Sequence, residues 1–247
     1  MDVVNRRLIH KYDHETIREV EDLVIKEYPF TILLNGQKLI TLLCTPRGLD
    51  YLSIGFLLSE GLIQKKEDII SLEIDEEKGI AKIETKKRER ISGELTEKRT
   101  VTTGACKGTV FYDVMDFFEY QRIDSPLKVH IEDILELVRK FSQASDLFLN
   151  TGGVHSTGIA AQKEILLFHE DVGRHNALDK VIGESFMKDM VLKDKMIITS
   201  GRISSEMLIK CAKREIPILI SRTAPTDLAL QLGEKIGMTI IGFARGL

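Results

Sequence analysis

The 247-residue sequence has few of the residues that cross-link a small fold or anchor a chain in a bilayer. It contains only three cysteines, and it also has no tryptophan and only five prolines. Three widely separated cysteines do not make a disulfide framework or a closely spaced zinc cluster, and they fit a reducing compartment. No apolar run approaches the ~20 residues of a membrane span, and residues 1–21 lack the apolar core of a signal peptide. We therefore expect a cytoplasmic protein that does not contact a membrane.

An excess of charge of either sign is also absent. Lys and Arg total 35, Asp and Glu total 38, and the formal net charge is -3. This balance gives no basic surface for nucleic acid, so we expect no nucleic-acid partner. The 43% hydrophobic and 30% charged content is that of a globular chain. Its length suits one large domain or two small ones.

The first half of the chain predicts hairpins around one buried helix. Residues 30–43 place an Asn-Gly pair, which is favoured in tight hairpin turns, between two apolar runs. Residues 69–85 predict a second hairpin. Between the hairpins, Thr45 as N-cap and Pro46 as the first helical residue predict a helix that ends at Gly61.

The second half alternates strands with helices, which predicts a mostly parallel sheet with helices on its faces. We divide the chain into an α+β part, residues 1–125, and an α/β part, residues 126–247, which would also be compatible with one continuous domain. The expected strands are residues 147–149, 165–169, 196–199, 216–220 and 238–243, and the expected helices are residues 129–141, 176–187, 204–214 and 225–236.

Three of these strands run into loops that each carry one arginine: Arg202, Arg222 and Arg245. Ligands of open α/β sheets bind beyond the carboxyl ends of the strands. Guanidinium groups and free helix N-termini hold phosphates there. The pattern predicts a site for a phosphorylated ligand. The alternative is that the loop hydroxyls cap helices and the arginines form surface ion pairs.

A second polar region consists of residues 150–155 and 170–176 and includes His155 and His175. Burying so many polar groups is costly unless they are used, so we interpret this region as a wall of a pocket. The alternative is that Asp171 caps the following helix and His155 has a structural role.

The three cysteines differ in their surroundings. Cys44 and Cys211 lie in apolar segments and are expected to be small buried hydrophobic residues. Cys106 lies in the glycine-flanked polar segment 102–109 beside Lys107, a cation that favours the thiolate. We therefore expect Cys106 to be a reactive nucleophile. A metal site that joins it to histidines is not favoured, so we predict no metal.

Several motifs together resemble one family. The most specific is the block Glu170-Asp-Val-Gly-Arg-His-Asn-Ala-Leu-Asp-Lys180, and further matches are residues 35–36, 45–46, 55–61, 150–155, 200–204, 221–226 and 242–246. Over nearly its whole length the chain is similar to the formate dehydrogenase accessory sulfurtransferases, the FdhD family. The resemblance implies an α/β fold with a cytidine deaminase-like mixed sheet and flanking helices, a smaller hairpin-rich N-terminal part, and a homodimer.

The resemblance also implies a reaction. Such proteins accept persulfide sulfur from a cysteine desulfurase and pass it to the molybdenum or tungsten bis(pterin guanine dinucleotide) cofactor of formate dehydrogenase, for which GDP serves as an analogue. Cys106 matches the cysteine that carries the persulfide. The matching cofactor-binding segment consists of Phe243, Ala244, Arg245, Gly246 and Leu247. We expect the same cavity to include Arg202, Arg222, His155 and His175.

One departure from the family pattern affects the chemistry. The second cysteine of the usual Cys-x-x-Cys pair is Thr109 here. Sulfur that leaves Cys106 must therefore go to an external thiol, to the metal or directly to an acceptor. An alternative function is a cofactor-binding chaperone for formate dehydrogenase, or a related molybdenum or tungsten enzyme, that moves no sulfur. A third, a deaminase-like hydrolase, requires zinc.

Overall fold

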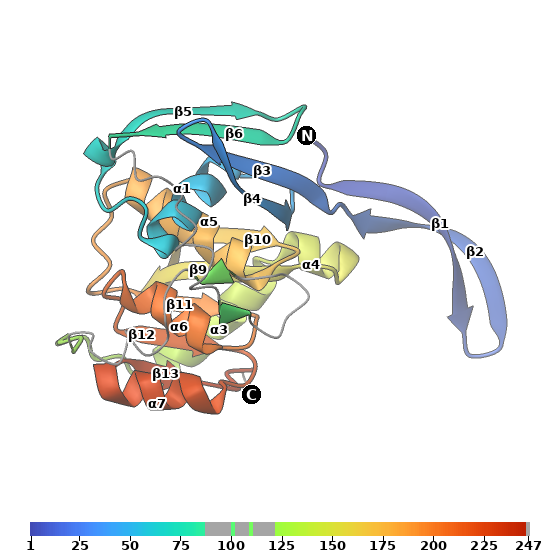
Figure 1. Cartoon of the computed structure of the whole chain (residues 1–247). Helices are drawn as coiled ribbons and strands as arrows, with labels where there is room; N and C mark the ends of the chain where they lie inside the picture. Colours follow the sequence, from blue (N-terminus) through green and yellow to red (C-terminus); the bar gives the residue numbers. More distant parts are fainter. Residues whose placement is uncertain (87–99, 102–108, 111–121, 246–247) are drawn as a thin grey trace.

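The computed structural model describes residues 1–86, 100–101, 109–110 and 122–245. One sheet has the order β4-β3-β6-β5, and a second has the order β10-β9-β11-β12-β13 (Figure 1). The strands of the first are β3 (Tyr28–Leu34), β4 (Gln37–Cys44), β5 (Ile69–Asp75) and β6 (Ile80–Thr85). Those of the second are β9 (His155–Ala161), β10 (Glu164–Asp171), β11 (Met196–Thr199), β12 (Ile218–Ser221) and β13 (Thr239–Ile241).

Two further strand pairs stand apart from these sheets: β1 (Val4–Asp13) with β2 (Thr16–Ile25), and β7 (Thr100–Val101) with β8 (Thr109–Val110). The described helices are α1 (Leu49–Glu60), the 3-10 turn η1 (Lys66–Asp68), α3 (Ile131–Gln143), α4 (Asp146–Thr151), α5 (Arg174–Met187), α6 (Ser205–Ala212) and α7 (Asp227–Ile236). Among them, none combines the length and apolarity needed to cross a bilayer.

Helices α1 and α5 lie between the two sheets and pack closely on each other (Figure 1). A Cβ on Gly55 would lie 1.8 Å from the carbonyl oxygen of Asp179, and a Cβ on Gly183 would lie 2.0 Å from that of Tyr51. Both contacts are shorter than any non-bonded approach, so only glycine allows these backbones to come this close. The two halves of the chain therefore share one tightly packed helix pair.

Residues of the second sheet alternate between two apolar layers, as expected for a sheet covered on both faces. Ile159, Ile197 and Leu219 belong to the core that also contains α1, α5 and the inner face of the first sheet. The neighbouring Ala160 and Ile198 pack with α3 on the other face. The sheet is therefore completely sandwiched, and only its strand ends remain for binding.

The predicted α/β class, with a mixed sheet and flanking helices, is confirmed, as are the two hairpins and the buried helix ending at Gly61. The cytidine deaminase-like detail and the division at residue 125 stay predictions. The expectation of a mostly parallel sheet is wrong, because β9 runs antiparallel to both β10 and β11. A two-residue turn joins β9 to β10, with Gln162 at a φ of 50°, and so short a connection forces antiparallel pairing.

Two local predictions are also wrong. Helix α1 begins after Gly48, not after Thr45, because the Thr45 hydroxyl accepts a hydrogen bond from the Val172 N–H (3.2 Å) instead of capping the helix. Residues 147–149 form part of α4 rather than a strand. In both cases a contact with β10 or the residues just after it overrides the local preference.

Candidate functional site

A cavity of about 530 Å³ opens beside the carboxyl ends of β11 and β12 and the residues that follow β13. This volume lies in the range of small-molecule sites. Its walls come from α4 and the residues after it, from the start of β9, and from the loops after β10, β11, β12 and β13. The lining residues are Phe148, Gly152, Gly153, Val154, His155, Val172, Ser200, Arg222, Thr223 and Arg245.

The chain after β13 is fixed against the loop after β12. The Phe243 N–H donates to the Thr223 carbonyl (3.1 Å), and the Arg245 Nε donates to the Arg222 carbonyl (3.1 Å). Phe243 has a φ of 55°, a left-handed conformation that is uncommon outside glycine and that turns the chain at this point. These contacts bring the two cavity arginines onto neighbouring segments.

Arg222 is a half-buried arginine of the cavity. Its Nε is buried, and within the described part of the chain it has no hydrogen-bond partner. A buried donor without a partner is costly, and a guanidinium group matches phosphate oxygens in a bidentate geometry. Arg245, which is exposed, adds a second positive charge at the same cavity. The cavity therefore has two positively charged side chains in its lining.

His155 also lines the cavity, and its Nδ1 is 3.3 Å from the Ser200 hydroxyl oxygen. Burial, together with the nearby positive charge of Arg174 and the neighbouring His175, lowers the pKa of His155. The ring is consequently neutral near pH 7, and it offers the cavity a hydrogen-bonding group rather than a charge.

The lowered pKa of His155 predicts a pH effect on stability. The folded-state pKa of His155 lies below its unfolded value. The contribution of the neutral ring to the free energy of unfolding is therefore complete above about pH 6.5 and is lost as the pH falls through the folded-state pKa. We expect the stability advantage of the wild type over His155→Gln to shrink on acidification, by at most about 1.4 kcal/mol per pH unit. Urea unfolding of both proteins at about pH 8 and pH 5 measures it; a constant difference contradicts the prediction.

Helix α4 forms a wall that the sequence did not indicate. The Glu170 carboxylate accepts the backbone N–H groups of Leu147 and Phe148 (3.2 Å each) and the Ser145 hydroxyl (3.1 Å). This carboxylate satisfies the free donors of the helix N-terminus, as a capping side chain does. Phe148 is thereby presented at the cavity with 43% of its surface exposed.

Gly152 ends α4 and then lines the cavity. Its φ of 64° requires glycine, although a Cβ there would meet no atom within 4 Å. The glycine is therefore explained by its left-handed backbone conformation at the helix end, whether or not a ligand approaches it.

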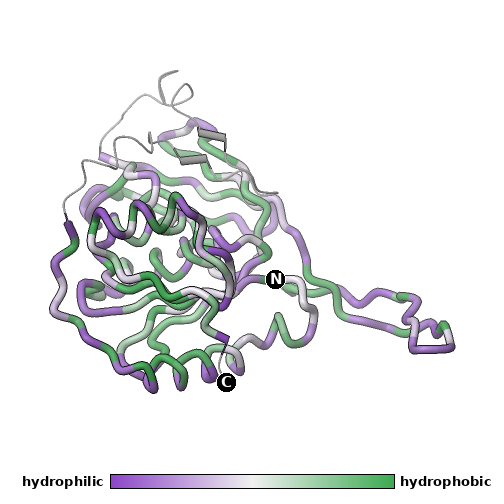
Figure 2. The backbone as a smooth tube through the Cα atoms, turned by 90° about the horizontal axis from the view of Figure 1, so that it is seen from below, coloured by the Kyte–Doolittle hydropathy of each residue, from purple (hydrophilic) through white to green (hydrophobic). Residues whose placement is uncertain are grey.

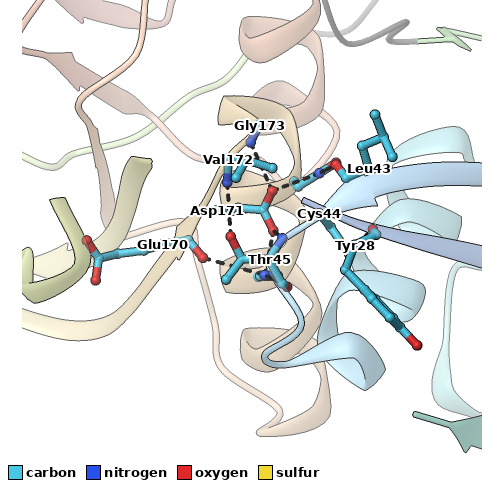
Figure 3. Close-up of polar contacts among 10 residues, drawn as sticks. Tyr28, Leu43, Cys44, Thr45, Glu170, Asp171, Val172 and Gly173 are labelled. Atoms are coloured by element: carbon cyan, nitrogen blue, oxygen red, sulfur yellow. Dashed lines mark hydrogen bonds and ion pairs between the residues drawn. The ribbon is translucent and has the colours of Figure 1, made fainter. Parts of the chain in front are cut away.

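Behind the cavity, the Asp171 carboxylate is completely buried and receives four hydrogen bonds (Figure 3). One oxygen accepts from the Thr45 N–H (3.0 Å) and from Lys180 Nζ (2.6 Å). The other accepts from the Gly173 N–H and from Asn176 Nδ2, both at 2.9 Å. Asp171 thus joins the end of β4 to the start of α5, and we call this cluster the Asp171 clamp.

The remaining polar residues of α5 form a second buried group. His175 Nε2 lies 3.1 Å from Glu206 Oε2, and Lys210 Nζ lies 2.6 Å from Asp179 Oδ2. The Ser59 hydroxyl donates to the other oxygen of Asp179 (2.6 Å). Most polar residues of the block from residue 170 to residue 180 therefore hold helices together. From this block, Val172 lines the cavity.

The predicted site residues divide into two groups. The structure brings His155, Arg222 and Arg245 together around the cavity. Arg202 and His175 are not among the described residues that line the cavity. Arg202 is exposed, and His175 is buried against α6. The strand-end loops thus meet as predicted, but their side chains do not all point the same way.

The C-terminal segment is described as far as Arg245. The Ala244 N–H donates to the Ser221 carbonyl (2.9 Å), and Phe243 is 62% exposed, with its ring centroid 5.7 Å from the Arg245 guanidinium carbon. Gly246 and Leu247 lie outside the described residues.

The cysteine predictions have separate outcomes. Cys44 and Cys211 are completely buried, as expected, and burial raises the pKa of both thiols, that of Cys44 to about 12. Cys106 lies outside the described residues. Across the described ranges, no three His, Cys, Asp or Glu residues are grouped to hold a metal ion.

Comparisons with known proteins agree with this architecture. The FdhD/NarQ family model matches residues 25–247. Proteins named sulfur carrier protein FdhD from Bacillus subtilis and Listeria innocua are each 39% identical, over 97% and 100% of this chain and 91% and 95% of their own lengths. A crystal structure described as a formate dehydrogenase accessory protein from Desulfotalea psychrophila superposes with a TM-score of 0.78 at 25% identity, covering 99% of this chain and 94% of that one. The chain therefore belongs to the FdhD/NarQ family.

Proposed function

We propose that this protein is a sulfur carrier that matures formate dehydrogenase. It accepts persulfide sulfur from a cysteine desulfurase on Cys106 and delivers it to the molybdenum or tungsten bis(pterin guanine dinucleotide) cofactor, which it holds as cargo. Two independent lines support the proposal. The relatives, aligned over almost their full length, are named sulfur carriers, and the cavity has the size and charge of a nucleotide site.

The observation that carries the binding half is that two arginines, Arg222 and Arg245, line one cavity. A pyrophosphate held there pairs with guanidinium groups and balances the charges of Arg222 and Arg245. A cavity of about 530 Å³ suits one guanylate arm rather than the entire cofactor with its two pterins and two guanines. The exposed ring of Phe148, on the α4 wall, offers a face on which a purine or pterin stacks.

The sulfur half of the proposal is a thiol exchange in two steps. The Cys106 thiolate attacks the terminal sulfur of the desulfurase persulfide, and the desulfurase cysteine leaves as its thiolate. Cys106 then gives up the outer sulfur and leaves as its thiolate; the sulfur is reduced to sulfide by two electrons from two external thiols, which are oxidised to a disulfide. Thr109 cannot form a disulfide with Cys106, so the reducing electrons come from outside this segment.

The binding half predicts the effect of removing each arginine. Arg222→Ala and Arg245→Ala are each expected to weaken GDP binding by about 1–3 kcal/mol, a five- to 150-fold rise in Kd, the usual scale for losing a charged hydrogen-bonding partner. Calorimetric titration with GDP measures it. Arg202→Ala is the matched control, because Arg202 follows a neighbouring strand but is exposed and is not among the cavity residues. Equal losses in all three variants, or in none, contradict the site.

A chaperone that binds the cofactor and moves no sulfur remains the second candidate, favoured by the single observation that Thr109 replaces the second cysteine. Incubation with a desulfurase and cysteine, followed by mass spectrometry of the intact chain, separates the two functions. The carrier gains the mass of one sulfur atom at Cys106, whereas the chaperone keeps its mass and still binds GDP. The partners of the proposed carrier are the desulfurase, the catalytic subunit of formate dehydrogenase and a second copy of the chain.

A further inference from the structure

A buried serine side chain, that of Ser221, joins the loops that follow β11 and β12. Ser221 is the last residue of β12 and is completely buried. Its hydroxyl donates a hydrogen bond to the Gly201 carbonyl (2.6 Å) in the loop after β11, and it accepts one from the Thr223 N–H (2.9 Å) in its own loop. We call these two hydrogen bonds the Ser221 tether. Ser221 is not among the described residues that line the cavity, but Arg222 and Thr223, which follow it, are.

Gly201, to which the tether is attached, is itself held in place. Its N–H donates to the Thr199 hydroxyl oxygen (3.2 Å), and that hydroxyl donates to the Ser156 carbonyl in β9 (3.2 Å). Thr199 and Ser156 are both buried. Hydrogen bonds are stronger in such an interior than in water, so the Gly201 carbonyl is a fixed acceptor. The Ser221 tether therefore attaches the loop after β12 to the interior of the second sheet.

The turn that carries Arg222 is held by backbone contacts at its two ends and by the tether between them. At its start, the Arg222 N–H donates to the Thr199 carbonyl (3.2 Å), and at its end Pro225 forms a bridge with Ile203. Between these points, the Thr223 N–H is bound by the Ser221 hydroxyl oxygen. A serine oxygen that accepts from the N–H two residues later fixes the conformation of a turn.

The C-terminal segment depends on the same turn. The carbonyls of residues 221–223 accept, in this order, from the Ala244 N–H (2.9 Å), the Arg245 Nε (3.1 Å) and the Phe243 N–H (3.1 Å). A shift of the turn would therefore move both cavity arginines. Because two like charges repel, these contacts, rather than any attraction between the side chains, keep the arginines at one cavity.

We propose that Ser221 is a positioning residue of the anion site. Its hydroxyl fixes the turn that places Arg222 at the cavity and, through the carbonyls of that turn, Arg245 as well. The inference rests on the proposed function for its ligand, a nucleoside diphosphate, and adds to that function a side chain outside the described cavity lining. Donors that are already in place bind without the cost of ordering the loops, and affinity falls with the fraction of molecules in the binding-competent conformation.

The test compares Ser221→Ala with a second buried serine. Ser221→Ala is expected to raise the Kd for GDP about three- to tenfold, because it removes both hydrogen bonds of the tether. Calorimetric titration measures the Kd, and urea unfolding measures stability. Ser185→Ala is the matched control: Ser185 is also completely buried, its hydroxyl donates to the Ile182 carbonyl (2.7 Å) in α5, and it is not among the described cavity residues. The control is expected to bind GDP as the wild type does. An unchanged Kd in Ser221→Ala, or the same rise in both variants, overturns the proposal.

A double-mutant cycle tests whether Ser221 acts through the arginine that follows it. Ser221→Ala is expected to raise the Kd for GDP by a smaller factor in an Arg222→Ala background than in the wild type, because part of what the tether positions is already gone. A residue that only stabilises the fold would lower affinity by the same factor in both backgrounds. Independent, multiplicative losses therefore contradict the proposal.

Hydrogen exchange decides the proposal even if Ser221→Ala does not fold or the wild type does not bind GDP. In the free wild type, the Thr223 N–H is expected to exchange slowly because it is bonded to a buried oxygen, and rapid exchange there overturns the proposal. A wild type with a protected Thr223 N–H that does not bind GDP refutes only the proposed function.

The folded variant adds a second comparison by hydrogen exchange. In Ser221→Ala, faster exchange is expected in residues 222–224 and 243–245. It is not expected in the ribbon formed by β1 and β2, which projects from the body in two views at right angles (Figures 1 and 2). Faster exchange in the ribbon as well would indicate a general loosening of the fold and would count against a local role for Ser221.

Discussion

Cys106→Ala abolishes the loading of sulfur from a desulfurase while GDP binding persists; this is the largest effect that we expect. A thiol accepts sulfur as its thiolate, and the two described cysteines cannot supply one. Cys44 and Cys211 are completely buried with raised pKa values. With a pKa of about 12, roughly one Cys44 in 10⁵ is ionised at neutral pH. Cys106, beside Lys107, is the thiol that remains.

The measurement is intact-mass spectrometry after incubation with desulfurase and cysteine, with and without a reductant that removes persulfide sulfur. Cys44→Ala is the matched control, because it removes a thiol while leaving Cys106 in place. The control is expected to gain the mass of one sulfur atom and to lose it on reduction. A reducible mass gain of one sulfur atom in Cys106→Ala refutes the assignment, whereas the same gain in the wild type and in Cys44→Ala, but not in Cys106→Ala, supports it.

Asp171→Asn has the largest effect on stability. Breaking a buried ion pair by neutralising one partner leaves the other charged and uncompensated, which costs about 3–5 kcal/mol. Lys180 is completely buried, and its Nζ lies 2.6 Å from the carboxylate that the substitution replaces with a neutral amide. Because the same carboxylate holds Thr45 and Asn176, the loss also loosens the contact between β4 and α5.

Urea unfolding measures this loss, and an exposed pair provides the comparison. Asp75 lies 2.9 Å from Lys78 in a surface turn, where solvent screens the pair, so Asp75→Asn is expected to change the free energy of unfolding far less than Asp171→Asn does. If the free energy of unfolding of Asp171→Asn lies within about 1 kcal/mol of the wild-type value, the Asp171 clamp is not the main link between the two halves of the chain.

The parts of the fold that the sequence predicted depend on local signals. The hairpin around Asn35 was recognisable because its turn pair favours positive φ, and Asn35 and Gly36 have φ values of 50° and 77°. Strands β11, β12 and β13 were recognisable as short apolar runs followed by loop residues. Because parallel neighbours end at the same edge of a sheet, two of the three loop arginines, Arg222 and Arg245, were correctly expected to meet.

The parts that were missed depend on contacts between distant residues. Helix α4 looks like a strand in the sequence, and its N-terminus is capped by Glu170, more than twenty residues away. Thr45 looks like a helix cap, yet its partners are 126 and 127 residues away. The β1–β2 ribbon was missed for a different reason: most of its side chains are exposed, so no clean alternation of apolar and polar residues marks its strands.

The sequence predicted which strand ends meet at the cavity but not all of the cavity's walls. Arginine-bearing strand ends indicate an anion site whichever way each side chain points, but spacing does not distinguish Arg202 from Arg222. Phe148 and the α4 wall had no sequence signal of their own. The Glu170 carboxylate that caps α4 was interpreted only as part of a polar pocket wall, because spacing along the chain does not reveal a contact across more than twenty residues.

The Asp171 clamp has a consequence for the order of events during synthesis. The Thr45 amide finds its acceptor 126 residues further along the chain, and α1 needs α5 to cover it. At ribosomal rates of ~5–20 residues per second, this delay is on the order of ten seconds. The apolar α1 therefore lacks its α5 contacts while the nascent chain emerges. Truncated products that stop before residue 171 keep this surface exposed, and we expect chaperones and proteases to bind them.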